Sequence, residues 1–164
     1  MIAPHAAVEV TAPCRRWQRD CAGAASLADS AARLALERCG APAAVVVDVT
    51  LADDAEQRAL NRTWRGIDAP TNVLAFPVAD PAAPLPDGAP LLLGDVVLAF
   101  ETVRREATEQ NKPFADHLRH LVVHGVLHLL GYDHIEPAAA AGMEQREIAI
   151  LAELGVPNPY RDTI

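Results

Sequence analysis

The sequence predicts one domain in which about four strands and about five helices alternate around a small sheet, a pattern of the α/β or α+β class. Two observations lead to this prediction. The 164 residues match the length of one ordinary domain and contain no internal repeat, so we treat residues 1–164 as a single unit. Along the chain, short β-branched segments alternate with longer segments that have the apolar spacing of helices.

The first third of the chain contains the clearest strand. A short alternating segment at Ala7 to Val10 leads into a loop, and Ser26 to Cys39 then has the pattern of an amphipathic helix that Gly40 ends. The next segment, Ala43 to Leu51, has a core of valines. Its short length and β-branched composition are typical of a buried strand.

In the middle of the chain, the sequence predicts a helix followed by two more strands. Acidic residues occupy the first turn of the predicted helix Asp53 to Arg62, where the helix dipole favours them. Gly66 breaks this helix, and Thr71 to Pro77 is a brief strand. The proline-rich stretch Ala79 to Pro90 is typical of a surface loop, after which Leu91 to Phe100 resumes as a strand.

Three helices are expected in the last third of the chain. They cover Glu101 to Gln110, Phe114 to Leu130 and Ala138 to Leu154. Pro113 immediately precedes the second of these helices, a position where the ring is tolerated. Gly155 ends the last helix, because glycine is the usual residue just beyond a helix.

Composition argues against several classes of protein. Although 51% of the residues are hydrophobic, no run approaches about 18 consecutive apolar residues, so we expect no membrane span. The N-terminus lacks the basic and then apolar profile of a secretory signal, so we expect a cytoplasmic protein. Cys14, Cys21 and Cys39 are odd in number and have no C-x-x-C spacing, so we expect reduced, half-buried thiols.

The charge of the chain bears on nucleic-acid binding in two opposite ways. A formal net charge of −8 opposes it, because polyanions are bound through Lys and Arg that replace counterions. The basic residues are almost all arginines, however, and Arg58, Arg62 and Arg65 lie close together. A guanidinium suits bidentate phosphate contacts. The alternative is that surface arginines such as Arg62 only form weak ion pairs, for example with Asp68.

The run H-G-V-L-H-L-L-G-Y-D-H predicts a metal site at the end of the expected helix Phe114 to Leu130. His124 and His128 are four residues apart, so both imidazoles project from one helix face and can converge on one cation. Gly131 suits a left-handed helix stop that would bring His134 to the same metal. Three histidines leave a fourth zinc position for water, which is the arrangement of a catalytic zinc site.

The same spacing matches the zinc-binding frame of the metzincin proteases, with one difference. Those proteases have Glu after the first His as general base, whereas this chain has Gly125. Met143 resembles the Met of their Met-turn, but a Met in an alanine-rich helix is more often a core residue. His117 and His120 precede the motif, and we expect them to pack or to support the ligands, since three ligands already complete a catalytic zinc site.

Three stretches together give the chain a family resemblance. They are the histidine motif, L-N-R-T-W-R-G-I-D-A-P-T-N-V-L-A-F-P at Leu60 to Pro77, and L-G-D-V-V-L at Leu93 to Leu98. In their order and spacing they resemble the YbeY family, the bacterial endoribonucleases also called rRNA maturation factors. The resemblance extends over nearly the whole chain.

The resemblance implies a fold, a cofactor and a substrate. The fold is α+β, a single domain with a small mixed sheet, surrounding helices and a zincin-like metal site at a helix end. By this resemblance, we expect the zinc ligands to be His124, His128 and His134, with one zinc per chain, and the functionally important arginine to be Arg65. The expected substrate is single-stranded RNA, in maturation of the 3′ end of the small-subunit rRNA and in ribosome quality control. Many members have Ser where this chain has Ala75.

Several details of the chemistry stay open at the level of sequence. Either a zinc-bound water or the 2′-OH of the RNA could attack the phosphodiester, and Arg65 would stabilise the charge that develops. Asp133 and Asp95 are candidates for the general base, although a structural role fits each of them better. Trp64 could stack on a base, but we first expect it to pack, because only 4% of the residues are aromatic.

Two other functions compete with the endoribonuclease. The first is a small zinc metallopeptidase, which shares the three-histidine frame. The second is a non-catalytic ribosome-assembly factor in which zinc only stabilises the fold and the acidic surface binds a basic ribosomal protein. The partners expected for the leading function are rRNA and the ribosome or its small-subunit proteins.

Overall fold

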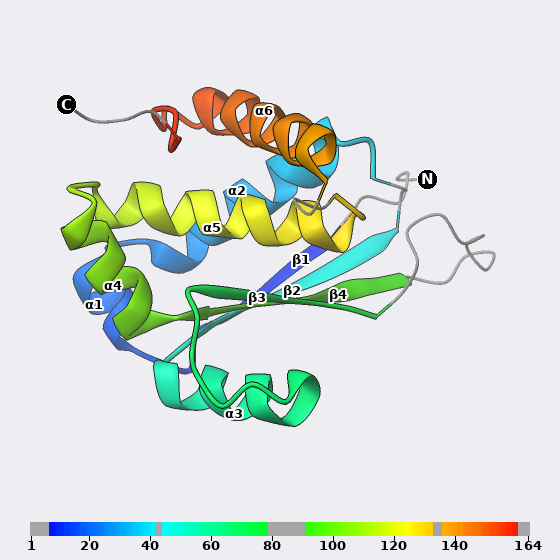
Figure 1. Ribbon diagram of the computed structural model, residues 1–164. Helices are drawn as coiled ribbons and strands as arrows, with labels where there is room; N and C mark the ends of the chain where they lie inside the picture. The colour runs from blue at the N-terminus through cyan, green and yellow to red at the C-terminus, as the bar shows by residue number, and fades with distance from the viewer. Residues whose placement is uncertain (1–6, 42–43, 79–90, 133–135, 161–164) are drawn as a thin grey trace, which may run out of the picture.

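The computed structural model describes residues 7–41, 44–78, 91–132 and 136–160, and these form one sheet and six helices (Figure 1). The α+β class with a small mixed sheet is confirmed. The predicted loop Ala79 to Pro90 lies outside the described residues. Among the described helices, none is both long and apolar enough to cross a membrane.

The sheet has four strands in the order β1-β2-β4-β3. Strands β1 (Ala7–Thr11), β2 (Val45–Ala52) and β4 (Leu91–Ala99) are parallel, and β3 (Val73–Pro77) runs antiparallel to β4. In β2 every second residue from Val45 to Leu51 is fully buried. This alternation follows from the two-residue period of a strand. The short strand β3 forms one edge of the sheet.

Helices cover both faces of the sheet (Figure 1). Helices α2 (Ala24–Arg38) and α5 (Phe114–Leu129) lie on one face, and α6 (Pro137–Glu153) packs outside them. Helix α3 (Asp54–Arg65) lies on the opposite face. Helix α4 (Phe100–Glu109) continues directly from β4. The main core therefore lies between the sheet and the pair α2 and α5, and it includes Met143, as expected.

Helix α1 (Arg16–Asp20) was not predicted from the sequence. Its single turn places Trp17 in the core, where the ring stacks on Phe114 and its Nε1 donates to the carbonyl of Ala52 over 2.8 Å. The burial of Trp17 stabilises this turn, since five residues are too few to form a stable helix alone. The three cysteines are free and at least partly buried, which confirms the expectation for them.

Candidate metal centre

Helix α5 brings His124 and His128 together on one face. Their Nε2 atoms are 3.1 Å apart and their ring centroids 4.6 Å apart. Residues four positions apart on a helix are neighbours, so this proximity follows from the sequence spacing. The sequence predicted that these two histidines converge, and the geometry agrees with that part of the prediction.

The end of α5 has a complete left-handed helix stop. Gly131 has a φ of 97°, its N–H donates to the carbonyl of His128 over 3.0 Å, and the N–H of Tyr132 donates to Leu127 over 3.0 Å. These two bonds define a Schellman motif. The chain therefore turns back at Gly131, as predicted. His134 and Asp133, which follow this turn, lie outside the described residues.

A cleft of about 640 Å³ opens beside the two histidines. Its walls come from α5, the edge strand β3, the segment before β3 and the last residue of α3, which lies on the other face of the sheet. Three of the lining residues carry groups suited to metal and phosphate chemistry, namely His124, His128 and Arg65. Among the described residues, no carboxylate lines this cleft.

Gly125 lets α5 approach the sheet at the floor of the cleft. A Cβ atom at this position would lie 2.6 Å from Cγ1 and 3.1 Å from Cγ2 of Val96, and 3.4 Å from Cγ2 of Val73. No side chain fits there without moving the helix away from the sheet. The Glu that metzincin proteases carry after their first His thus has no room in this fold.

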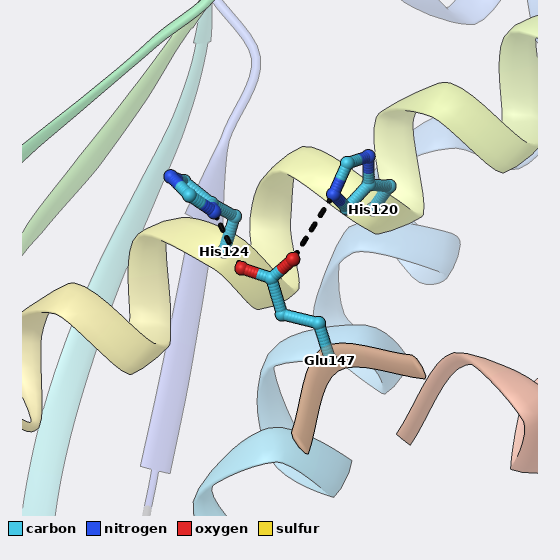
Figure 2. Close-up of side chains that lie close together, drawn as sticks. All are labelled: His120, His124 and Glu147. Atoms are coloured by element: carbon cyan, nitrogen blue, oxygen red, sulfur yellow. Dashed lines mark hydrogen bonds and ion pairs between the residues drawn. The ribbon is translucent and has the colours of Figure 1, made fainter. Parts of the chain in front are cut away.

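A buried carboxylate supports His124 from the side away from the cleft. Glu147 of α6 has no solvent exposure, and its Oε1 accepts a hydrogen bond from Nδ1 of His124 over 2.5 Å. Its Oε2 accepts from Nε2 of His120 over 3.2 Å and from the hydroxyl of Tyr160. Figure 2 shows one nitrogen of each imidazole directed at this carboxylate and the other directed away.

These contacts decide the charge of Glu147. Burial raises its pKa by disfavouring the anion, but hydrogen bonds from His120, His124 and Tyr160 outweigh burial and lower the pKa to about 2. The phenol shows the converse effect, because burial and the neighbouring carboxylate raise the pKa of Tyr160. Glu147 is therefore a carboxylate at neutral pH, and Tyr160 is a neutral donor.

His120, His124 and Glu147 also form a group that could hold a metal ion, with ligand atoms within 4.8 Å of one another. Two metal positions are thus compatible with the described residues. One lies on the cleft side, between the Nε2 atoms of His124 and His128. The other lies on the α6 side, at Glu147.

Comparison with known proteins identifies the family. The model of the family described as Endoribonuclease YbeY matches residues 14–155. A Rhodopseudomonas palustris protein named Endoribonuclease YbeY is 48% identical over 170 residues, which cover 98% of this chain and 92% of the relative. A Paramagnetospirillum magneticum protein of the same name is 51% identical over 155 residues, which cover 93% of this chain and 94% of the relative. The chain belongs to the endoribonuclease YbeY family.

A solved structure supports the fold of this YbeY-family chain. The solution structure of a Thermotoga maritima protein superposes with a TM-score of 0.55 at 24% identity, covering 96% of both chains. At this level of identity the likeness concerns the fold alone. The family itself is established by the sequence matches, which confirm the resemblance drawn from the motifs.

The structure places the predicted arginines of this YbeY-family chain in different surroundings. Arg65, at the end of α3, lines the cleft with the two histidines. Arg58 instead forms a bidentate pair with Asp68, with N–O distances of 2.8 and 3.1 Å. The direct contact with Asp68, given as an example for Arg62, is thus made by Arg58, while Arg62 acts on Asp68 only through its charge. Of the three arginines, only Arg65 is a wall residue of the cleft.

The expectation for Trp64 needs correction, whereas Asp95 has the structural surroundings that the sequence favoured for it. Trp64 does not pack, because 71% of its surface is exposed. Asp95 is poorly placed as a general base, because it precedes Val96, which faces Gly125, and adjacent strand residues point to opposite faces of the sheet. Burial and the neighbouring Asp48 raise the pKa of Asp95. Its surroundings are those of a structural carboxylate.

Sequence reasoning overlooked Glu147 and Tyr160. The signal for Glu147 was present, because it lies four residues after Met143 and three and four residues before Ile150 and Leu151, all of them buried. A Glu on the apolar stripe of a helix has to find partners in the core. Nothing in the sequence pointed to Tyr160. His117 is buried with Nε2 2.9 Å from Oε1 of Glu106, so the expectation that it packs is confirmed.

Proposed function

We propose that this chain is a zinc-dependent endoribonuclease that cuts single-stranded RNA, with one zinc ion bound by His124, His128 and His134. The observation that carries the proposal is the meeting of two imidazole nitrogens and Arg65 in one cleft. The names of the relatives, Endoribonuclease YbeY, supply the reaction and the substrate.

The distance between the Nε2 atoms of His124 and His128 suits a shared zinc ion. Two nitrogens bound to one tetrahedral zinc ion at about 2.0–2.1 Å lie about 3.3 Å apart. The Nε2 atoms of His124 and His128 are 3.1 Å apart, so the ion needs only a small adjustment of the rings. His134 is proposed as the third ligand from the sequence motif alone, because it lies outside the described residues.

The residues of the cleft suit a phosphodiester better than a peptide. When bound, zinc supplies a Lewis acid and makes a coordinated water more acidic. The guanidinium of Arg65 is available to bind a phosphoryl oxygen and to stabilise the negative charge that develops on it. Because Gly125 excludes a Glu from α5, the general base of a metallopeptidase has no counterpart there.

We further propose ribosomal RNA as the physiological substrate, with the 3′ end of the small-subunit rRNA as the site of maturation and ribosome quality control as a second role. The proposed partners are the ribosome or its small-subunit proteins, and the proposed location is the cytoplasm. These proposals rest on the family resemblance of the motifs and on the family match.

The test is a cleavage assay with zinc-loaded protein on single-stranded RNA, double-stranded RNA and an unstructured peptide. Wild type should cut single-stranded RNA, and His128→Ala should abolish the activity. Arg65→Ala should lower the rate by about 10²–10³-fold, as removal of a transition-state donor does. Arg62→Ala is the matched control and should cut normally, since Arg62 does not line the cleft.

Two outcomes would overturn the proposal. Peptide cleavage without RNA cleavage, lost in His128→Ala, would assign a metallopeptidase. Absence of any turnover above that of His128→Ala, together with normal ribosome association, would assign a non-catalytic assembly factor with a structural zinc.

A further inference from the structure

Glu147 is unusual because it is a charged group on the apolar face of α6. Its neighbours on that face are Met143, Ile150 and Leu151, and its side chain has no solvent exposure. A buried carboxylate is costly unless it is paired and hydrogen-bonded. A helix that retains Glu at such a position therefore requires specific donors from other parts of the fold.

The donors come from two separate segments. Helix α5 supplies Nδ1 of His124 and Nε2 of His120, at 2.5 and 3.2 Å (Figure 2). The C-terminal segment supplies the hydroxyl of Tyr160. That segment is itself anchored, because Nζ of Lys112 donates to the carbonyl of Pro159 over 3.0 Å. Glu147 thus joins the metal-site helix, α6 and the C-terminal segment.

The carboxylate also fixes which nitrogen of His124 can present its lone pair to a cation. An ionised carboxylate only accepts hydrogen bonds, so Nδ1 of His124 carries the proton and Nε2 of the neutral ring carries the lone pair. This Nε2 is the atom that faces Nε2 of His128 beside the cleft. A carboxylate behind a metal-bound imidazole orients the ring and increases its basicity.

We propose that Glu147 is a positioning residue that orients His124 for zinc, and that Tyr160 of the C-terminal segment holds Glu147 in place. The inference rests on the proposed function, since it takes the zinc ion to lie on the cleft side of His124. It gives a role in metal binding to two residues that lie outside the histidine motif.

The alternative is that Glu147 is itself a ligand, together with His120 and His124. The position of the cleft argues against it, because His124 and His128 line the cleft whereas His120 and Glu147 do not. Both oxygens of Glu147 already accept hydrogen bonds. Of the three residues of that group, only His124 lines the cleft.

The test is the zinc affinity of full-length variants, measured by competition with a chromophoric chelator. Glu147→Ala should weaken zinc binding by about 10–100-fold, the usual effect of losing such a partner. Glu147→Gln keeps an acceptor for Nδ1 of His124 and should lose less. Tyr160→Phe should weaken binding measurably. Glu144→Gln is the control, because it removes the same charge from an exposed position on the same helix.

Two further measurements separate positioning from folding. Melting of each zinc-free variant reports whether the fold is intact, and a loss of zinc affinity in a variant that melts like wild type assigns a positioning role. In protein loaded with Co²⁺, Glu147→Gln should shift the visible absorption bands, which report the ligand geometry, whereas Glu144→Gln should not. If Glu147→Ala fails to fold, Glu147→Gln and Tyr160→Phe decide the question.

The outcomes distinguish this inference from the proposed function. Wild-type zinc affinity in both Glu147→Gln and Tyr160→Phe would overturn the inference and leave the proposed function intact. Loss of zinc in His120→Ala, with zinc binding retained in His128→Ala, would place the metal at Glu147 and overturn the positioning role. Absence of zinc binding by wild type would overturn both.

Discussion

The structure gives Gly125 a packing role that the sequence alone does not show. In the sequence it marks only the absence of a protease base, whereas in the fold it determines how closely α5 approaches β4. A Cβ atom at position 125 would lie 2.6 Å from Cγ1 of Val96, so there is no space for a methyl group. A change of this one residue therefore affects the packing of the helix that carries both cleft histidines.

Replacement of Gly125 by Ala should destabilise the protein. Overpacking of this kind costs about 1–3 kcal/mol. Gly142→Ala is the matched control in helix α6, where nothing lies within 4 Å of the added carbon, and it should stabilise by about 0.5–1 kcal/mol. The free energy of unfolding of both variants in urea checks this. Equal stability of the two variants would show that the Val96 side chain moves aside without any loss of folding free energy.

His117 should make the metal-free protein sensitive to acid. Burial lowers the pKa of His117 below its ordinary value of 6.5, so the folded state binds fewer protons than the unfolded state as the pH falls. Its contribution to stability is therefore complete above pH 6.5 and is lost as the pH falls below that value. His117→Gln removes this group and should lose less stability on acidification.

The measurement for His117 is the free energy of unfolding at about pH 7.5 and at about pH 5.5, on either side of the histidine range. The variant should be less stable at the higher pH, because it loses the bond from Nε2 to Glu106. A fall in stability as large in His117→Gln as in wild type would contradict the role assigned to His117.

At the scale of elements, the end of α3 carries an exposed aromatic residue one position before the cleft arginine. Trp64 is exposed and adjacent in sequence to Arg65, and the helix ends at Gly66 with a φ of 71°. Exposed aromatic rings beside cations are the usual platform on which single-stranded bases stack. With the proposed substrate, Trp64 would bind a base next to the phosphate that Arg65 contacts.

Trp64 should report RNA binding directly by fluorescence. The chain has two tryptophans, and the other, Trp17, is fully buried. Single-stranded RNA should therefore quench the emission of wild type but not that of Trp64→Phe. Trp64→Ala should weaken RNA binding by about 1–3 kcal/mol while leaving the melting temperature unchanged. Equal quenching in Trp64→Phe, or unchanged affinity in Trp64→Ala, would exclude a stacking role.

The sequence predicted elements well where local pattern and tertiary structure agree. The strand expected at Ala43 to Leu51 is observed at Val45–Ala52, and the helix expected at Phe114 to Leu130 is observed at Phe114–Leu129. Helix α1 could not be predicted, because its reason to form is the burial of Trp17 against Phe114, a partner far away in sequence. The expected helix Asp53 to Arg62 continues to Arg65, and this last turn carries the cleft arginine.

Of the candidate site, the sequence predicted only the contacts between residues that are close together in the chain. The convergence of His124 and His128 follows from helix spacing, and the reversal at Gly131 follows from its conformational freedom. The contribution of Glu147 depends on how α6 packs on α5, and that of Tyr160 depends on where the C-terminal segment returns. Contacts between elements so distant in sequence are set by the fold and carry no local pattern.

At the scale of the whole molecule, charge and metal binding are connected. The net charge of −8 repels RNA at long range, so binding has to rely on local cations in the cleft. Arg65 supplies one, and a bound zinc ion would supply two more positive charges beside it. The same ion would link α5 to the turn after it, so zinc should also stabilise the fold.

Zinc should therefore raise the melting temperature of the protein. A ligand that binds the native state at 100 times its dissociation constant stabilises by about 2.7 kcal/mol, which for a chain of this length corresponds to roughly 5–10 °C. His128→Ala should show no rise, whereas Arg65→Ala should rise like wild type, because Arg65 lies in the cleft without being a proposed ligand. Because the unfolded chain exposes Cys14, Cys21 and Cys39, which also bind zinc, the measured rise should fall at the lower end of this range. An equal rise in wild type and His128→Ala would place the stabilising ion outside the histidine site.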